Sequence, residues 1–395
     1  MTITAFDLHL ASRAEPRAQA PIPPAVTLQA MATAVPSYTL RQEDVIRRVK
    51  HLFSDRRLDI DRLLPAFDNA GILTRRSCMP IDWYLTPSDW KTRNQLFIDN
   101  AVELLEEAAL DCLARAGLGP EAVDGLVTVS TTGVATPSLD AHLMNRMAFR
   151  SDLQRLPIFG LGCAGGVIGL SRAAAMARAT PGAKILCLVV ELCALTFRAN
   201  DRSKSNVIAT ALFGDGAAAV LLEAPEPVTP ASKGAPVRSQ APGSAAQNGR
   251  SPAQGPRLAA GGEFTWPASL DVMGWTVEND GLGVLFSRDI PALVRERLGS
   301  ALDGFLSEQG LGRDDIDGYI CHPGGAKVIA ALEEVFGLED GALKDARSVL
   351  RDFGNMSAVT VLFVLERMRA AGLSGRYVMT ALGPGFTAGF QILEA

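Results

Sequence analysis

The sequence predicts an α/β fold built from two similar halves that pack as one body. Segments with the apolar run of a buried strand alternate with segments that have the apolar period of a helix. Alternation of this kind is typical of α/β proteins. In addition, two stretches of the first half recur in the same order in the second half, which favours internal duplication over chance similarity of strand edges.

The two recurring stretches occupy corresponding places in the halves. AGLGPEAVDG leads into the apolar run LVTVS in residues 116–130, and QGLGRDDIDG leads into YICH in residues 309–322. Later, GDGAAAVLLEA in residues 214–224 is echoed by GPGFTAGFQILEA in residues 383–395. In each half we therefore expect a helix, a glycine-containing connection, a buried strand, and finally a strand that ends in Leu-Glu-Ala.

Hydrophobic periodicity predicts the other elements in chain order. The stretch 94–116 has an apolar stripe and a Glu-rich outer face, as expected of a helix that covers a core. Short apolar runs without a helical period predict buried strands. The predicted helices are 94–116, 166–179, 290–309, 326–336 and 359–371, and the predicted strands are 125–130, 156–159, 183–190, 217–222, 318–322 and 376–381.

Two segments of biased composition divide the chain. Residues 1–25 are rich in Ala and Pro, which predicts a flexible N-terminal extension. Residues 224–262 are rich in Pro, Ala and Gly and poor in large apolar side chains, which predicts a low-complexity insertion that forms a surface loop or linker. The ordered parts are then an N-terminal half, residues 26–223, and a C-terminal half, residues 263–395.

The composition excludes several classes of function. A net charge of −5 without a strong basic field gives no sign of a nucleic-acid partner. No stretch of about 18 consecutive apolar residues is present, so no transmembrane segment is expected, and the N-terminus lacks the pattern of a secretory signal. The six cysteines have no CxxC pair or framework spacing, so we expect reduced thiols in a cytoplasmic protein, and neither disulfides nor a metal site.

The segment FGLGCAGGVIGL, residues 159–170, holds the first candidate for a chemical role. Cys163 lies among glycines and aliphatic residues, just before the helix predicted over 166–179. A helix N-terminus favours a thiolate, and glycines let other groups approach the sulfur closely. The segment by itself leaves two interpretations open, a nucleophile and a small packing residue in a crowded turn.

A nucleophilic cysteine needs a base and a group that stabilises an oxyanion. Of the four histidines, His322 is best placed, because it follows a buried strand and precedes a glycine-rich turn. Asn355 opens an apolar helix in DFGNMSAVTVLFVLERM, where it can cap the helix or donate to an oxyanion. For both residues a purely structural role stays open, as a buried imidazole and as a helix cap.

Five motifs in sequence order resemble those of a known family. GCAGG, ALFGDGAAA, CHPGGAKVI, GNMSAVTVLFVLERM and GPGF resemble type III polyketide synthases, the chalcone synthase-like branch of the thiolase superfamily, over residues 36–395 apart from the insertion. The resemblance implies the duplicated αβαβα layered fold of thiolases and a homodimer. It also implies a catalytic triad of Cys163, His322 and Asn355 that acts on acyl-CoA and malonyl-CoA without a cofactor or a metal.

The same resemblance assigns positions that contact substrate. Phe213 matches a phenylalanine that lies beside the triad and assists decarboxylation, and Val284 stands where plant chalcone synthases have a bulky gating Phe. The smaller side chain would widen the entrance and favours a long aliphatic starter. Other matches to the substrate pocket are Thr131, Thr132, Cys193, Thr196, Ser357, Gly383 and Phe386. The basic residues offered as contacts to CoA are Arg75, Arg76 and Lys327.

The predicted function is therefore that of an acyltransferase. It would condense an acyl-CoA starter with malonyl-CoA by iterative decarboxylative Claisen condensation and cyclise the chain to an alkylpyrone, an alkylresorcinol or a resorcylic acid. Alternatives are a ketoacyl-ACP synthase III-like enzyme, a type III synthase with a short or aromatic starter, and an inactive thiolase-fold binding subunit. HPGG where the synthase III enzymes have HQAN disfavours the first, and the intact triad disfavours the last. Starter length and carrier, number of extensions and cyclisation route stay open.

Overall fold

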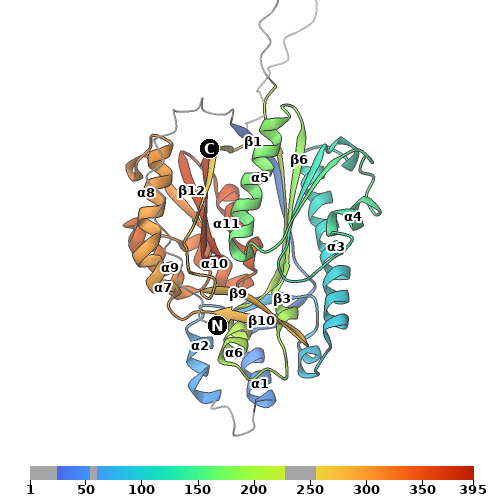
Figure 1. Ribbon diagram of the computed structural model, residues 1–395, viewed down its shortest axis with the longest axis vertical. Coiled ribbons are helices and arrows are strands. Elements are labelled where there is room, and N and C mark those ends of the chain that lie inside the picture. Colours follow the sequence, from blue (N-terminus) through green and yellow to red (C-terminus); the bar gives the residue numbers. More distant parts are fainter. Residues whose placement is uncertain (1–24, 54–59, 227–254) are drawn as a thin grey trace, which may run out of the picture.

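A computed structural model of the chain describes residues 25–53, 60–226 and 255–395. Residues 1–24 of the predicted N-terminal extension and residues 227–254 of the predicted insertion lie outside the described residues. The described part is an arrangement of strands and helices in layers (Figure 1).

A nine-stranded mixed sheet runs through the described part, in the order β11-β12-β13-β8-β1-β7-β6-β4-β5. The contributions of the two halves join where β1 and β8 pair antiparallel, Val26 with Leu258 and Thr27 with Arg257. The strands of the first half are β1 (Val26–Ala34), β4 (Gly125–Val129), β5 (Gln154–Ile158), β6 (Lys184–Leu192) and β7 (Asp215–Glu223). Those of the second half are β8 (Arg257–Thr265), β11 (Gly318–Cys321), β12 (Arg376–Gly383) and β13 (Thr387–Glu394).

The two halves share their strand order and their pairing directions. β1, β7, β6 and β4 correspond to β8, β13, β12 and β11, and in each set the first two pairings are antiparallel and the third is parallel. The recurring aspartates match as well. The Asp124 carboxylate accepts from the backbone N–H of Lys184 at 2.8 Å, and the Asp317 carboxylate accepts from that of Arg376 at 2.6 Å.

The Leu-Glu-Ala ends of the halves are also held alike. The backbone N–H of Gly182 donates to the carbonyl of Ala224 at 2.9 Å, and that of Gly375 donates to the carbonyl of Ala395 at 3.1 Å. In both cases the glycine precedes the strand that runs beside the Leu-Glu-Ala strand. Equal topology with equal hydrogen bonds at the repeated motifs confirms the predicted duplication.

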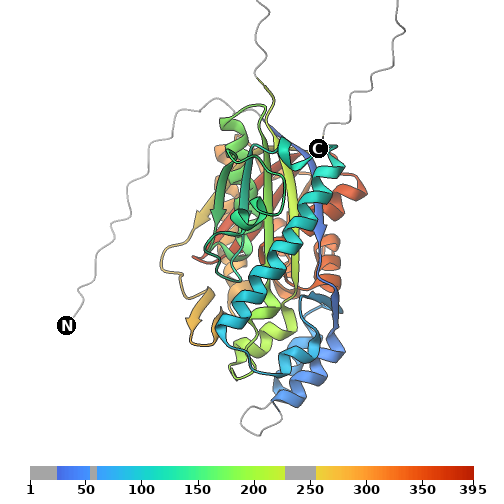
Figure 2. The same cartoon turned by 90° about the vertical axis from the view of Figure 1, so that its right-hand side faces the viewer.

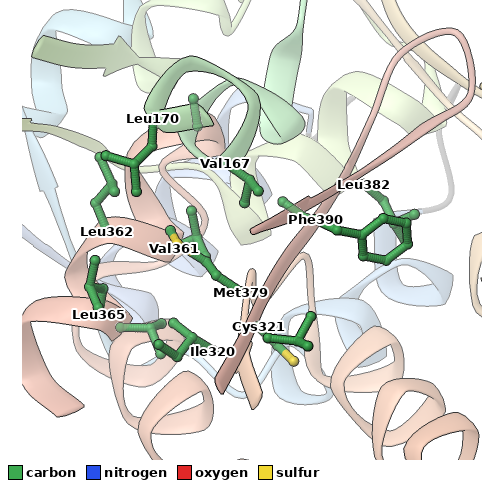
Figure 3. Packing of buried hydrophobic residues seen from close by; sticks show 14 of the residues in the cluster. Val167, Leu170, Ile320, Cys321, Val361, Leu362, Leu365, Met379, Leu382 and Phe390 are labelled. Atoms are coloured by element: carbon green, nitrogen blue, oxygen red, sulfur yellow. The ribbon is translucent and has the colours of Figure 1, made fainter. Parts of the chain in front are cut away.

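Helices alternate with the sheet in layers. α5 (Gly165–Ala179) and α11 (Thr360–Ala371) lie between the two halves, where Val167 and Leu170 of α5 pack with Val361 and Leu362 of α11 in one large apolar cluster (Figure 3). α3 (Trp90–Arg115) crosses the other face of the first-half strands (Figure 2), and α8 (Gly299–Glu308) contacts β8 and β13 of the second half. This succession is the αβαβα layering that the resemblance implied.

Small residues make the central layer possible. α5 reads GGVIGLSRAAAMARA, and a Cβ on Gly169 would lie 2.5 Å from Val129 Cγ2 of the neighbouring strand. The helix can therefore approach the sheet more closely than a bulkier sequence would allow. The outer helix α3 instead begins with a side-chain cap, because the Asp89 carboxylate accepts from the backbone N–H of Thr92 at 2.7 Å.

Further elements gather at one end of the sheet, at the bottom of Figure 1. They are β2 (Tyr38–Arg41), β3 (Thr74–Ser77), β9 (Met273–Glu278), β10 (Gly281–Phe286), α1 (Gln42–Leu52), α2 (Leu64–Asp68) and α6 (Lys204–Leu212). The remaining helices are α4 (Leu139–Met144), α7 (Ile290–Leu293), α9 (Ala326–Phe336) and α10 (Lys344–Phe353). Among the described residues, no helix has both the length and the apolar character needed to cross a membrane.

One predicted boundary is wrong, and one predicted helix has an irregular interior. The insertion predicted over 224–262 is too long, because β8 begins at Arg257 and pairs with both β1 and β13. Its sequence RLAAGGEFT is rich in Ala and Gly, so composition hid a strand near the centre of the sheet. The helix predicted over 290–309 is helical from Ile290 to Glu308, and a π-helical turn over Val294–Leu298 divides it into α7 and α8.

Candidate active site

Cys163 lies in a 3₁₀ turn, Gly162–Ala164, directly before α5, as predicted. The turn needs its glycines. Gly162 has a φ of +48°, and a Cβ on it would lie 2.5 Å from Pro384 Cδ. A Cβ on Gly166 would lie 2.1 Å from the carbonyl oxygen of Ala358, before α11. The glycines thus let the N-termini of the two central helices meet beside the sulfur.

His322 follows β11 and is held by its backbone. Its N–H donates to the carbonyl of Thr380 in β12 at 2.9 Å. The side chain is buried, and neither ring nitrogen has a hydrogen-bond partner among the described residues. Burial alone lowers the pKa of His322 to about 3, so the ring is neutral at pH 7. A neutral imidazole with both nitrogens unpaired can accept a proton or donate to a substrate oxygen.

Asn355 is fixed by a backbone bridge to Phe213. Its N–H donates to the carbonyl of Leu212 at 2.8 Å, and its carbonyl accepts from Gly214 at 3.1 Å. The preceding Gly354 has a φ of +71°, and a Cβ there would lie 2.7 Å from the Leu212 oxygen, so this turn requires glycine.

The side chain of Asn355 is held at both polar atoms, but it does not cap α11 as expected. Its Oδ1 accepts from the backbone N–H of Ser357 at 2.8 Å, at the start of the 3₁₀ turn Ser357–Val359 that precedes α11. Its Nδ2 donates to the carbonyl of Gly324, beside His322, at 3.1 Å. An amide nitrogen carries two hydrogens, so one stays available for a ligand.

These three residues come from distant parts of the chain and line one small cavity of about 20 Å³. Cys163 belongs to the first half, and His322 and Asn355 belong to the second. The other lining residues are Met273, Phe286, Ile290, Gly324, Val328, Leu332, Thr380, Ala381 and Leu382. The structure therefore brings together the three side chains that the sequence singled out, in mostly apolar surroundings.

Burial decides the resting charge of the pair. It raises the pKa of Cys163 to about 12, and the nearby Glu191 carboxylate raises it as well, while a hydrogen bond with Ser357 lowers it. With the pKa of His322 lowered to about 3, burial favours a neutral thiol and a neutral imidazole in the resting site. The partly exposed sulfur still lies at the N-terminus of α5, which favours negative charge when it develops.

Glu191 is a site residue that the sequence reasoning missed. It is the last residue but one of β6, is fully buried, and accepts from the Thr131 N–H at 3.0 Å and the Thr132 hydroxyl at 2.8 Å. Burial raises the pKa of Glu191 to about 7, against these hydrogen bonds and one from Ser357. An acidic residue at the end of a continuous apolar strand was the available signal.

Thr131 and Thr132 hold this network and do not line the cavities beside Cys163. The Thr131 hydroxyl accepts from the Gly162 N–H at 3.1 Å, which fixes the turn that carries Cys163. The Thr132 hydroxyl accepts from the Leu192 N–H at 2.9 Å while it donates to Glu191. In this structure the two hydroxyls therefore position the Cys163 turn and Glu191.

A second cavity of about 40 Å³ adjoins Cys163 on the side of the β9–β10 hairpin. Its lining includes the predicted Phe213, Val284 and Ser357, and also Gly162, Met273, Gly274, Trp275, Leu285, Phe286 and Pro384. Phe386 does not reach this cavity. Its ring is buried and stacks on Trp266 at 5.3 Å, so in the GPGF loop Pro384 lines the cavity, and Gly383 packs against the Cys163 turn.

A third cavity of about 60 Å³ lies beyond Phe213 and is lined mainly by apolar side chains. The predicted Cys193 and Thr196 line it with Phe213. Further lining residues are Leu40, Val45, Arg48, Val49, Leu52, Arg75, Ile81, Tyr84, Leu85, Ala194, Phe197, Ala209 and Thr210. Phe213 is the residue that the linings of this cavity and of the β9–β10 cavity at Cys163 share.

The predicted CoA contacts lie in different environments. Arg75 is fully buried in β3, and burial lowers its pKa to about 9, so its position argues against a contact with CoA phosphates at the surface. Arg76 is partly exposed, and Lys327 is exposed near the start of α9, beyond His322. No group of three or more acidic, Cys or His side chains suited to a metal ion occurs among the described residues.

Comparison with known proteins gives one consistent result. Residues 79–226 match the family described as chalcone and stilbene synthases, N-terminal domain, and residues 259–393 match the C-terminal domain of the same family. The chain is 38% identical to a 1,3,6,8-tetrahydroxynaphthalene synthase of Streptomyces peucetius over 371 residues, 93% of each protein. It is 29% identical to a 3,5-dihydroxyphenylacetyl-CoA synthase of Streptomyces toyocaensis, over 93% of this chain and 89% of that protein.

Among solved structures, the fold is similar to that of 1,3,6,8-tetrahydroxynaphthalene synthase from Streptomyces coelicolor, a bacterial type III polyketide synthase. The TM-score is 0.81 with 27% identity, and the match covers 93% of this chain and 98% of the other. Fold, matched domains and relatives agree with one another. The chain belongs to the chalcone and stilbene synthase family of type III polyketide synthases, which are acyl-CoA-condensing acyltransferases.

Proposed function

We propose that this enzyme loads a long aliphatic acyl group from CoA onto Cys163, extends it with malonyl-CoA and cyclises the product to an alkylpyrone or an alkylresorcinol (or its resorcylic acid). The observation that carries the proposal is the meeting of Cys163, His322 and Asn355 in one apolar cavity. Their chemistry accounts for the two steps of a condensation cycle, acyl loading and chain extension.

Loading transfers the acyl group from one sulfur to another. Cys163 Sγ attacks the thioester carbonyl while neutral His322 takes the thiol proton. The carbonyl carbon forms a bond to Cys163 Sγ, and its bond to the CoA sulfur breaks. His322 returns the proton to the departing CoA thiolate, so the site is neutral again. With its pKa lowered to about 3, the His322 ring is unprotonated at the start of this step and can accept the proton, but the same shift makes it a weaker base.

Extension uses the same residues as hydrogen-bond donors. When malonyl-CoA loses CO₂, the electron pair of the broken C–C bond forms an enolate at the thioester. The His322 ring and the free hydrogen on Asn355 Nδ2 can donate to its oxygen in a buried, water-poor cavity, where such bonds are strong. The enolate carbon attacks the acyl-Cys163 carbonyl, and the bond to Sγ breaks. Cys163 leaves as a thiolate that takes up a proton from water, and the chain is two carbons longer on CoA.

The apolar cavity beyond Phe213 supports the choice of an aliphatic starter. Its lining from α1, α6 and the 3₁₀ turn at Cys193 is largely Leu, Val, Ile, Ala and Phe, which matches an alkyl chain. The names of the two relatives above refer to different products, so family membership alone does not choose the starter. A short or aromatic starter is the alternative within the family.

The resemblance also implies a homodimer, and exposed apolar side chains support one. β5 is the edge strand of the sheet, and Leu156 on it, Phe159 just after it and Val134 are all exposed. A paired copy would cover this edge. We place the enzyme in the cytoplasm, because loading requires a reduced Cys163 thiol.

A panel of starters tests the proposal. The enzyme is incubated with malonyl-CoA and acyl-CoAs from acetyl to stearoyl, together with benzoyl-CoA, and products are identified by mass spectrometry. We expect alkylpyrones or alkylresorcinols, with the highest kcat/KM for starters of about ten or more carbons. A preference for acetyl-CoA or benzoyl-CoA would overturn the aliphatic starter. Turnover only with malonyl groups on a carrier protein would favour the ketoacyl-ACP synthase alternative.

A further inference from the structure

The β9–β10 hairpin places a bulky side chain opposite the small Val284. In the antiparallel register Trp275 of β9 faces Val284 of β10, and Met273 faces Phe286. Directly opposed residues of an antiparallel pair project to the same face, and residues two apart on one strand share it. Trp275 and Val284 are therefore neighbours on one surface of the hairpin.

That surface is the wall of the cavity beside Cys163. Trp275 and Val284 line it together with Cys163 and Phe213. The ring of Trp275 lies 6.0 Å from that of Phe213, centroid to centroid, with an interplanar angle of 58°. This is within the range of favourable aromatic pairs. β10 has only the small Val284 at this position, but Trp275 on β9 supplies an aromatic ring there. This ring packs against Phe213, which also lines the apolar third cavity.

We propose that Trp275 is a specificity-determining residue that gates the space beside Cys163. It leaves room for an unbranched chain next to the thioester and excludes acyl groups with a ring at that point. Val284 alone then does not widen the entrance, because the opposed Trp275 fills the space. The inference deepens the proposed function and rests on it for the identity of the reaction, since it concerns the starter of that same site.

The test compares one aliphatic and one aromatic starter. kcat/KM is measured with dodecanoyl-CoA and with benzoyl-CoA for the wild type and Trp275→Ala. Removal of a ring from a substrate pocket should raise the benzoyl-to-dodecanoyl ratio by about tenfold or more. Val277→Ala is the matched control, because Val277 lies two residues further on the same strand face but is 83% exposed and outside the cavity. The ratio of this control should stay at the wild-type value.

A swap of bulk between the strands sharpens the test. Val284→Phe alone should lower kcat/KM for both starters, because it adds a ring to a space that Trp275 already fills. In the double variant Trp275→Ala/Val284→Phe the ratio should return toward the wild-type value. Non-additivity of this kind is expected only if the two side chains share one space. An unchanged ratio in Trp275→Ala, or fully additive effects in the double variant, would overturn the gate.

Two further measurements keep the inference separate from the proposed function. Acylation of Cys163 is followed by intact-protein mass without malonyl-CoA, so the starter ratio can be read even if no condensation product forms. If Trp275→Ala does not fold, Trp275→Leu, which keeps an apolar side chain without the ring, takes its place. Wild-type enzyme that loads starters but never condenses them contradicts the proposed function alone. A Trp275 variant with wild-type loading selectivity contradicts the gate alone.

Discussion

The two halves of this protein end corresponding strands with different residues. After β4 come Thr131 and Thr132, whose hydroxyls bond to the Cys163 turn and to Glu191. After the corresponding β11 comes His322, whose ring nitrogens have no partner among the described residues. By contrast, at the other end of the repeat Asp124 and Asp317 each accept from the backbone N–H of the corresponding strand, and Asp124 accepts from Arg150 as well.

This difference shows that the residues that hold the fold are repeated in both halves, whereas the candidate catalytic residues are not. Duplicated hydrogen bonds give both halves the same frame, and the residues at the strand ends then diverge. The first half fixes the turn of the nucleophile through the Thr131 and Thr132 hydroxyls, although Glu191 Oε1 has no partner among the described residues. The second half supplies His322, whose two ring nitrogens are buried and unpaired and can bind substrate. Because an unpaired buried polar group lowers stability, such groups in a native fold point to a function.

The largest expected effect comes from the nucleophile of the first half. Cys163→Ala should abolish acyl loading and lower the condensation rate by about 10⁴-fold or more, since the covalent intermediate is lost. Intact-protein mass after incubation with an acyl-CoA measures loading directly. Cys187→Ala is the control, because Cys187 is a fully buried thiol in β6 of the same half and lies in the core. Product at the wild-type rate from Cys163→Ala would show that another group carries the chain.

The next largest effect is expected from Asn355 of the second half, whose substitution should slow decarboxylation more than acyl loading. Asn355→Asp should slow malonyl-CoA decarboxylation by about 10²- to 10³-fold, because an ionised carboxylate repels the enolate and cannot donate to it. Loading of Cys163 should be less affected, because in our mechanism it requires only the thiol and His322. The release of CO₂ from malonyl-CoA and the mass of the acyl-enzyme are measured in parallel. Equal losses in both steps would mean that Asn355 acts by holding the fold of the turn.

Sequence reasoning reached the frame and the three candidate site residues through local signals, but only the family resemblance joined those residues into one predicted triad. The repeated Asp-Gly and Leu-Glu-Ala motifs mark matching strands, and glycines surround Cys163, His322 and Asn355. It missed β8 because an Ala- and Gly-rich strand has no hydrophobic pattern, although a place between two strands buries it.

The contacts that sequence could not supply are those between distant segments. Val284 suggested an open entrance, and only the pairing of β9 with β10 shows that Trp275 stands opposite it. Phe386 and Arg75 were read from motifs as contacts to substrate or CoA, but they are buried, Phe386 against Trp266 and Arg75 within β3. Side-chain direction in a loop or an irregular strand depends on tertiary packing, which a motif does not encode.

The smallest effect tests the frame itself. Asp124→Asn and Asp317→Asn should each lower the free energy of unfolding by about 1 kcal/mol, because each replaces a charged acceptor of a backbone N–H by a neutral one. Urea unfolding at pH 7 measures both, with Asp314→Asn as the control. Asp314 is exposed, and its carboxylate makes no side-chain hydrogen bond among the described residues. A loss for only one of the two variants would contradict the equivalence of the halves.

Asp124 adds a pH dependence with a defined sign. Burial alone would raise its pKa, but the Lys184 N–H and the Arg150 guanidinium lower it below its usual value. A carboxyl whose pKa is lower in the folded state contributes stability above its unfolded pKa of about 3.9 and loses that contribution as the pH falls through the folded value. The stability difference between wild type and Asp124→Asn should therefore be full at pH 7, begin to shrink near pH 4 and vanish in stronger acid. A difference that grew on acidification would mean that Asp124 is protonated more readily in the fold, against the bonds that hold the first half of the frame.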